Sequence, residues 1–185
     1  IGSGANRKEG YLEFRTAMKA VDSSIQVGAV GVTPQNGWTN WGNEVIEEAG
    51  DVMDFYVIHQ YAYFEPPAGG YAAVLAQPQQ GDWTWAEIMT DYENALDQFA
   101  NGRSIPVAIT EHNLFSVQDQ DNGRWMTQAV NMLFMADSIG QMITHGVDIA
   151  NQWDLANGQA NNGTDYGLLN ADSYARSPQY YVYPL

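Results

Sequence analysis

The sequence predicts an α/β fold in which helices alternate with the strands of a parallel sheet. Apolar residues recur at helical spacing in four segments, and each of these segments is followed by a short apolar run that is typical of a strand. Alternation of this kind is typical of right-handed crossover units. With 185 residues, of which 45% are hydrophobic, the chain is long enough to bury one sizeable core.

Four helices are predicted because apolar side chains lie three or four positions apart. They are residues 8–21, with Tyr11, Phe14, Met18 and Val21 on one face; the segment NEVIEEAGDVM, residues 43–53; a segment with Trp85, Ile88, Tyr92, Ala95 and Phe99; and a segment with Trp125, Ala129, Met132, Ala136, Ile139 and Ile143. Asn101-Gly102 follows the third segment, and a glycine at this place is typical of a helix end.

Four strands are predicted from apolar runs between these helices. They are IQVGAVGV (residues 25–32), FYVIHQY (55–61), IPVAITEHN (105–113) and VDIANQWDL (147–155). The first run is rich in valine, so we expect it to be buried on both faces, as parallel strands are. A loop with Pro66, Pro67, Gly69 and Gly70 is predicted after the second strand, and the C-terminal tail is predicted as loop with a short aromatic segment, SPQYYVYPL.

Two closures of such a sheet are possible, an open doubly wound sheet or a (β/α)8 barrel. No glycine-rich phosphate turn follows any strand, which weakens the nucleotide-binding option. Polar residues instead gather where three strands end: His59 and Tyr61, residues 111–113, and residues 152–154. Barrel enzymes place their chemistry at this rim. A whole barrel takes about 250 residues, so residues 1–185 are predicted to hold about four of its strands and helices.

Composition excludes several classes of function. The net charge is −15, with two Lys and five Arg, so nucleic acid is a poor partner. The absence of cysteine excludes thiol chemistry and disulfides. No apolar run approaches the roughly 18 residues of a membrane span, and the start IGSGANRKEG lacks the apolar region of a signal peptide. An acidic, cysteine-free, Trp- and Tyr-rich chain fits a secreted bacterial enzyme.

Glu111 is the strongest candidate catalytic residue. It directly follows the apolar part of the strand VAITEHN, which places it at the predicted rim. A carboxylate in this position can attack the anomeric carbon of a sugar and form a glycosyl-enzyme intermediate. The alternative is an ordinary exposed loop glutamate.

The chain contains five motifs in a fixed order: the strand GAVGV, then FYVIHQY, ITEHN, QWDL and YGLLN…RSPQYY. On the order of these motifs, the chain resembles the second half of a clan A retaining glycoside hydrolase, with α-L-arabinofuranosidases and related barrel glycosidases as the nearest likeness. The resemblance implies that residues 1–185 are the C-terminal half of a single catalytic barrel. It also implies that Glu111 is the nucleophile at the end of strand seven, that His59 and Tyr61 end strand six, and that Trp153 ends strand eight.

The same resemblance implies a double-displacement hydrolysis of plant or algal polysaccharides without a cofactor. The acid/base glutamate would belong to a preceding polypeptide that forms the N-terminal half of the barrel. Alternation along the strand points His59 and Tyr61 the same way. A tyrosine hydroxyl near Glu111 can stabilise the carboxylate by donating a hydrogen bond, and Trp153 can stack on a sugar ring. Packed core side chains are the alternative for all three.

Other polar and aromatic residues near the predicted rim are weaker candidates. His112 has no partner at metal-ligand spacing, so it is interpreted as structural or supporting and no metal site is predicted. Glu65 and Asp154 can reach sugar hydroxyls from loops, but a solvated carboxylate is the simpler interpretation of each. Trp83, Trp85 and Tyr63 can line outer subsites, although Trp85 fits helix packing better.

Glu44 belongs to an Asn-Glu pair that resembles the proton donor of many sugar-cleaving barrels. The preceding residues PQNGWTN predict a turn-rich loop instead of an apolar strand. Glu44, Glu47 and Glu48 then lie at positions i, i+3 and i+4, as on a solvated helix face, and Asn40 or Asn43 can cap that helix. Glu44 is therefore predicted to be exposed on a helix and not catalytic.

The sequence is also compatible with two other classes of function. One is a carbohydrate-binding module without catalysis, built on a barrel scaffold; the other is a structural or assembly subunit without a sugar site. Only the enzyme requires a second carboxyl group beside Glu111. Because half a barrel would expose apolar strand edges, we expect a preceding polypeptide to cover them, with a homodimer of half-barrels as the alternative.

Overall fold

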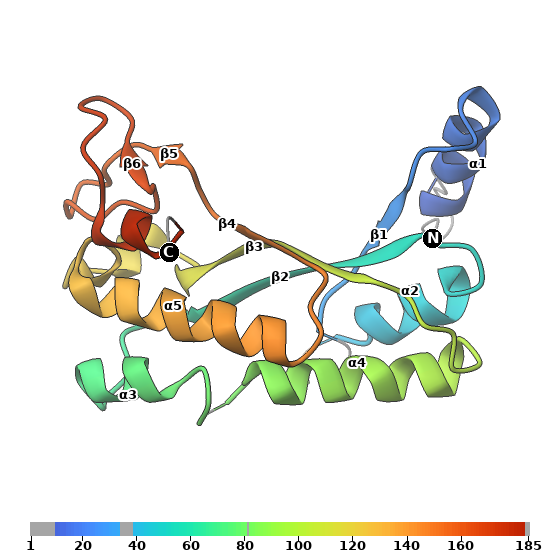
Figure 1. Ribbon diagram of the computed structural model, residues 1–185, viewed down its shortest axis with the longest axis horizontal. Coiled ribbons are helices and arrows are strands. Elements are labelled where there is room, and N and C mark those ends of the chain that lie inside the picture. The colour runs from blue at the N-terminus through green and yellow to red at the C-terminus, as the bar shows by residue number, and fades with distance from the viewer. Residues whose placement is uncertain (1–9, 34–38, 81, 184–185) are drawn as a thin grey trace. The chain divides into compact units, whose positions relative to one another are not determined.

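The structure is a computed structural model that describes residues 10–33, 39–80 and 82–183 (Figure 1). The helices are α1 (Tyr11–Val21), α2 (Trp41–Ala49), α3 (Gly70–Ala76), α4 (Trp85–Phe99) and α5 (Ala129–Thr144). The strands are β1 (Gly28–Val30), β2 (Phe55–Tyr63), β3 (Val107–Phe115), β4 (Ile149–Gln152), β5 (Ala156–Asn157) and β6 (Leu169–Asn170), and three short 3-10 helices are η1 (Gln118–Gln120), η2 (Trp125–Thr127) and η3 (Pro178–Val182).

The main sheet has the order β1-β2-β3-β4, so neighbours in space are neighbours in the chain. β1 pairs with β2 in parallel, with Gly28 opposite Phe55. Helices separate the four strands in the chain, which is the connection that parallel strands require. This confirms the predicted α/β class with a parallel sheet. β5 and β6 form a separate two-stranded parallel pair.

The chain divides into two compact units. Unit 1 comprises residues 1–58 and 88–108, and unit 2 comprises residues 59–87 and 109–185. β2, β3 and α4 each continue from one unit into the other. None of the helices in the described parts of the chain is both long and apolar enough to cross a membrane.

The core of unit 1 forms where α2 and α4 bury their apolar faces. In α2, Val45, Ile46 and Ala49 are buried at a spacing that puts them on one side of the helix. Tyr56 of β2 is fully buried and stacks on Tyr92 of α4, with ring centroids 5.3 Å apart. Such stacked pairs add to the free energy gained from burying their area.

The first strand of unit 1 corrects the prediction. β1 covers only Gly28–Val30, not residues 25–32, and the side chain of Val30 is 60% exposed. The expectation of burial on both faces was wrong because the described residues cover only one side of β1. The first helix begins at Tyr11; Lys8, where it was predicted to begin, lies outside the described residues. Its predicted apolar face is also uncovered, since Phe14 is 60% exposed.

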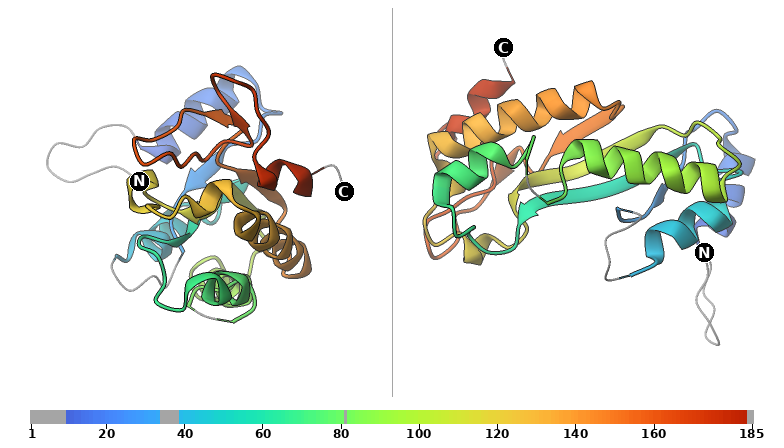
Figure 2. Two further views of the ribbon diagram at one scale, coloured as in Figure 1. Left: turned by 90° about the vertical axis from the view of Figure 1, so that its left-hand side faces the viewer. Right: turned by 90° about the horizontal axis from the view of Figure 1, so that it is seen from below.

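The core of unit 2 lies between the C-terminal parts of β2 and β3 and the helices α3 and α5. Its buried members are Val74, Leu114, Phe115, Met126, Val130, Phe134, Met135 and Tyr166. α3 and α5 lie side by side in Figures 1 and 2 and are in contact. This packing fixes the strand ends that carry the polar residues.

Three segments of unit 2 differ from the prediction. The loop after β2 contains a helix, α3, because the run YAAVLA favours helix and buries Val74 once the turn at Gly70 is complete. The fourth predicted helix is divided into η2 and α5, with Gln128 at the N-terminal cap of α5. The fourth strand is short, and its end, Gln152, comes directly before Trp153.

Candidate active site

Glu111 lies in β3, in the part of the strand that belongs to unit 2. Its side chain is 27% exposed, so the carboxylate is accessible although the strand around it is buried. The hydroxyl of Tyr61, on the neighbouring strand β2, donates a hydrogen bond of 2.9 Å to Glu111 Oε2. Oε1 of the same carboxylate accepts no hydrogen bond from any residue that the structure describes. One carboxylate oxygen is therefore held and the other is free.

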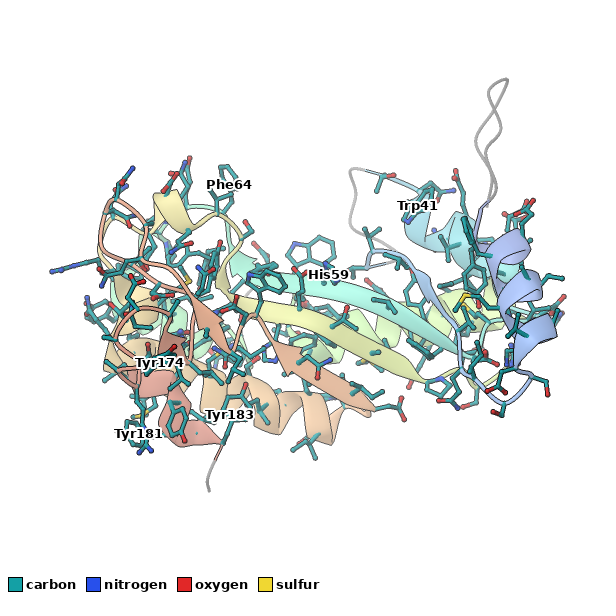
Figure 3. All side chains as sticks on the ribbon, turned by 90° about the horizontal axis from the view of Figure 1, so that it is seen from above. Trp41, His59, Phe64, Tyr174, Tyr181 and Tyr183 are labelled. Atoms are coloured by element: carbon teal, nitrogen blue, oxygen red, sulfur yellow. The ribbon has the colours of Figure 1, made fainter. Side chains whose placement is uncertain are left out.

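His59 lies on β2 two positions before Tyr61 and reaches the same carboxylate. Its Nδ1 is 3.4 Å from Glu111 Oε2, and its Nε2 is 2.9 Å from Oγ1 of Thr110. Its side chain is 44% exposed and projects from the sheet in Figure 3. As expected from strand alternation, His59 and Tyr61 share one side of β2, and both approach Glu111.

Tyr61 holds its hydroxyl proton more tightly than a free tyrosine does. Burial raises the pKa of its hydroxyl, and the hydrogen bond to Glu111 raises the same pKa further. The phenol therefore keeps its proton and directs it at the carboxylate. A donor fixed in this way orients the Glu111 carboxylate through Oε2.

Trp153 follows β4 and is held through its backbone. Its N–H donates to the carbonyl of His112 at 3.1 Å, and its carbonyl accepts from Nδ2 of Asn113 at 2.5 Å. The side chain is 41% exposed. Both residues that bond the Trp153 backbone belong to β3, the strand of Glu111. The backbone that carries the indole is therefore fixed beside that strand.

Asp154 corrects the interpretation of a solvated loop carboxylate. It is half-buried, and its Oδ1 is buried without a hydrogen-bond partner among the described residues. Burial raises the pKa of Asp154, and the negative charge of Asp165 raises it further. Glu65, in contrast, is exposed as expected.

A buried network of side-chain amides connects β3, the strand of Glu111, to α5 and η3. Asn131 of α5 donates to Oδ1 of Asn113 at 3.3 Å and also bonds Gln179 of η3. Gln179 in turn donates to the carbonyl of Tyr166 at 2.8 Å, and the ring of Tyr166 meets Tyr61 edge-on at 6.4 Å between centroids. No local sequence pattern predicts this network, because its amides Asn113, Asn131 and Gln179 are isolated and far apart in the chain.

His112 is 2% exposed and faces away from the Glu111 carboxylate, into a small cavity. Neither ring nitrogen has a hydrogen-bond partner among the residues described, and burial lowers the pKa of His112 to about 4. The volume of the cavity is about 10 Å³. Its lining includes Gln60, Gln77, Trp83, Trp85 and Ser138. The burial of His112 agrees with its interpretation as structural or supporting, and its role stays a prediction.

The aromatic residues that were candidates for outer subsites are placed differently. Trp85 is 5% exposed and donates to Oγ of Ser138 at 2.7 Å, so it belongs to helix packing as expected. The hydroxyl of Tyr63 donates to the carbonyl of Ala73, and its ring packs against the core of unit 2. Trp83 is 38% exposed and borders the cavity of His112.

Glu44 lies in the first turn of α2 and is exposed, which confirms its predicted placement on a solvated helix face. Asn40 occupies the N-terminal cap position, but its side chain makes no capping hydrogen bond. Oγ1 of Thr39 instead accepts from the N–H of Trp41, the first residue of the helix, at 3.2 Å. Part of the preceding loop, residues 34–38, lies outside the described residues. In the ranges that the structure describes, no group of three or more His, Asp or Glu could hold a metal ion.

Comparisons with known proteins find likeness in structure alone: no family model and no curated protein matches the chain. An α-L-arabinofuranosidase from Thermotoga maritima, solved as an arabinose complex, is 22% identical with a TM-score of 0.63, and the match covers 94% of this chain and 33% of that chain. A family 51 α-L-arabinofuranosidase from Bifidobacterium longum is 15% identical with a TM-score of 0.68, covering 92% and 37%.

A GH39 enzyme from Xanthomonas axonopodis pv. citri is 13% identical with a TM-score of 0.64, and covers 94% of this chain and 34% of that chain. At these identities the comparisons show the fold: the chain has the fold of a part of glycoside hydrolase structures. The resemblance to arabinofuranosidases and related glycosidases therefore holds at the level of structure. The chain spans about a third of the length of the solved proteins that it matches.

Proposed function

We propose that this protein is a retaining glycoside hydrolase and that Glu111 is its nucleophile. The observation that carries the proposal is the state of the Glu111 carboxylate. Tyr61 holds Oε2 by a hydrogen bond of 2.9 Å, His59 lies beside the same oxygen, and Oε1 is left free of the described residues. A carboxylate that is oriented and accessible has the properties of a nucleophile at an anomeric carbon.

The proposed reaction has two displacements. Glu111 Oε1 attacks the anomeric carbon, the glycosidic C–O bond breaks, and a second carboxylic acid gives its proton to the leaving oxygen. Water, deprotonated by that second group, then attacks the same carbon and releases Glu111 as a carboxylate. The product has the configuration of the substrate, because each displacement inverts the anomeric centre.

The neighbours of Glu111 divide the remaining work. The Tyr61 hydroxyl stabilises the carboxylate before attack and must release it as the ester forms. Trp153, 41% exposed, offers an apolar face for a sugar ring, and His59 shapes the same subsite. The substrates we propose are plant or algal polysaccharides, with arabinofuranosides favoured by the enzymes named in the structural matches.

The second carboxylic acid is proposed to come from polypeptide that completes a (β/α)8 barrel, of which residues 1–185 form the C-terminal half. The strands at the two edges of the sheet support this: Val30 of β1 is 60% exposed and Ile149 of β4 is 48% exposed. Parallel strands are normally buried on both faces, and exposed apolar edges favour aggregation. The structural matches are about three times as long as this chain.

A secreted location is part of the same proposal.

The test replaces Glu111 in the full-length protein that contains this chain. Glu111→Gln should lower the turnover of an activated aryl glycoside by several orders of magnitude, since the nucleophile is lost. In Glu111→Ala, azide should restore turnover and give a glycosyl azide of inverted configuration. Glu93→Gln, a change at an exposed position of α4, is the control and should leave turnover unchanged.

Near wild-type turnover in Glu111→Gln would remove Glu111 from the mechanism. A protein that binds polysaccharide but hydrolyses none of the aryl glycosides would instead favour the carbohydrate-binding module. Isothermal titration with soluble xylan, arabinan and agarose fragments separates that module from an assembly subunit, which would bind none of them.

A further inference from the structure

His59 is positioned by a residue with no role in the proposed displacement, Thr110. The side chain of Thr110 is half-buried, and its Oγ1 lies 2.9 Å from Nε2 of His59. The other ring nitrogen, Nδ1, lies 3.4 Å from Oε2 of Glu111. The imidazole thus lies between a hydroxyl and a carboxylate: Nε2 is hydrogen-bonded to the hydroxyl, and Nδ1 lies within ion-pair distance of the carboxylate without a hydrogen bond to it.

The chemistry of the two neighbours determines where the proton of a neutral His59 resides. An ionised carboxylate accepts hydrogen bonds and donates none. A lone pair on Nδ1 would therefore repel Glu111 Oε2, whereas an Nδ1–H is attracted to it. With the proton on Nδ1, Nε2 carries the lone pair, and Thr110 Oγ1 must donate to it. In a histidine the hydrogen bond of one ring nitrogen sets the state of the other.

We propose that Thr110 is a positioning residue that holds His59 in the Nδ1–H tautomer and keeps Nδ1 beside the Glu111 carboxylate. A hydroxyl suits this task because it can donate to a neutral imidazole and accept from a protonated one, without leaving its place. His59 needs such a fixed partner because its side chain is 44% exposed and the surrounding protein does not confine the ring. This inference rests on the proposed function of Glu111.

The consequence for Glu111 is a second positive dipole at Oε2. The Tyr61 hydroxyl already donates to that oxygen at 2.9 Å. An Nδ1–H of His59 beside the same atom would further stabilise negative charge on Oε2. Oε1 is then left as the attacking oxygen. Loss of the Thr110 hydroxyl lets the ring rotate or change tautomer, and the orientation of the carboxylate then depends on Tyr61 alone.

The experiment compares Thr110→Val, which keeps the shape but lacks the hydroxyl, with Thr110→Ser, which keeps the hydroxyl. Both are made in the full-length protein labelled with ¹⁵N-histidine, and His59→Gln identifies the His59 signals. At alkaline pH, we expect wild type and Thr110→Ser to show a protonated Nδ1 and an unprotonated Nε2. Thr110→Val should show averaged signals from both tautomers.

Turnover gives the second readout. Thr110→Val should lower kcat about 3-fold to 10-fold, the effect of one hydrogen bond, with a smaller change in KM, and Thr110→Ser should restore kcat. Thr144→Val, which removes an exposed hydroxyl at the end of α5, should change neither readout. A wild-type His59 protonated on Nε2, or a Thr110→Val enzyme with wild-type kcat, would overturn the proposal.

The two proposals can fail separately. The ¹⁵N spectra report the tautomer of His59 without any catalysis, so they test the role of Thr110 even if Glu111→Gln remains active. If Glu111→Gln is inactive but the spectra show the same tautomer in Thr110→Val and wild type, the proposed function stands and the role of Thr110 is refuted.

Discussion

The hydroxyl of Tyr61 and the carboxylate of Glu111 are joined by a 2.9 Å hydrogen bond across two neighbouring strands, although the residues are 50 positions apart in the chain. β2 and β3 are neighbours in the sheet, and this brings the C-terminal half of β2 beside Glu111 in the middle of β3. This part of the sheet thereby carries an oriented carboxylate, a donor that keeps its proton, and an imidazole.

Removal of that hydroxyl should weaken the nucleophile without harming the fold. We expect Tyr61→Phe to lower kcat about 10-fold to 100-fold, the effect of a hydrogen bond to a charged group. Tyr63→Phe is the matched control: its hydroxyl also donates a hydrogen bond, at 3.2 Å, but to the backbone carbonyl of Ala73. Steady-state kinetics on an aryl glycoside measure both. Equal losses in the two variants would contradict a specific role of Tyr61.

Glu44 should be dispensable. It is exposed on α2, and its neighbour Asn40 approaches it at 3.5 Å, which is a weak contact. Glu44→Gln should change the free energy of unfolding by less than about 0.5 kcal/mol, as exposed substitutions do, and should leave kcat at the wild-type value. Urea denaturation and steady-state kinetics check the two parts. A large loss of kcat would mean that Glu44, not a residue of another segment, is the proton donor.

His112 should make the folded protein sensitive to acid. Burial lowers its pKa from the ordinary 6.5 to about 4. Between these values the unfolded chain binds a proton that the folded protein does not, so stability rises with pH. The contribution is fully present above pH 6.5 and is lost as the pH falls toward 4.

Urea denaturation of the full-length protein at pH 7 and pH 4.5 measures this effect. From pH 7 to pH 4.5, the free energy of unfolding of the wild type should fall by about 2 kcal/mol more than that of His112→Gln. His145→Gln, at the C-terminal cap of α5, is the control and should keep the wild-type difference. An unchanged pH difference in His112→Gln would show that another group, or a changed structure around the cavity, accounts for the acid sensitivity.

The elements of the fold were predictable where periodicity was strong. The strand ITEHN and the helix from Trp85 to Phe99 lie where the sequence predicts them, because each has a long apolar pattern and a clear polar or glycine end. Alternation of helix and strand allowed both a sequential order and the reversed order of a doubly wound sheet, and the observed order is sequential. Glu111, His59 and Tyr61 were predicted because they follow apolar runs, although β2 continues to Tyr63 and β3 to Phe115, so none of the three ends its strand.

Other features depend on contacts that spacing does not show. α3 was predicted as loop because Pro67 and Gly70 mark turns, although the buried Val74 stabilises a helix after them. Thr110 carried a weak signal, a polar residue inside an apolar strand next to Glu111, and its partner His59 is 51 positions away. The pairing of Asn131 with Asn113 had no local signal, since an amide gains a partner only through the fold.

The central claim is that Glu111 forms a covalent bond to the sugar. The direct measurement is mass spectrometry of the full-length protein after incubation with a panel of activated 2-deoxy-2-fluoro glycosides, which slow the release of a glycosyl-enzyme intermediate. We predict that one such glycoside adds the mass of a single fluoroglycosyl group, and that peptide mapping places it on Glu111. The account would be contradicted if the protein hydrolyses the corresponding ordinary glycoside but the fluoroglycosyl group is found on another carboxylate.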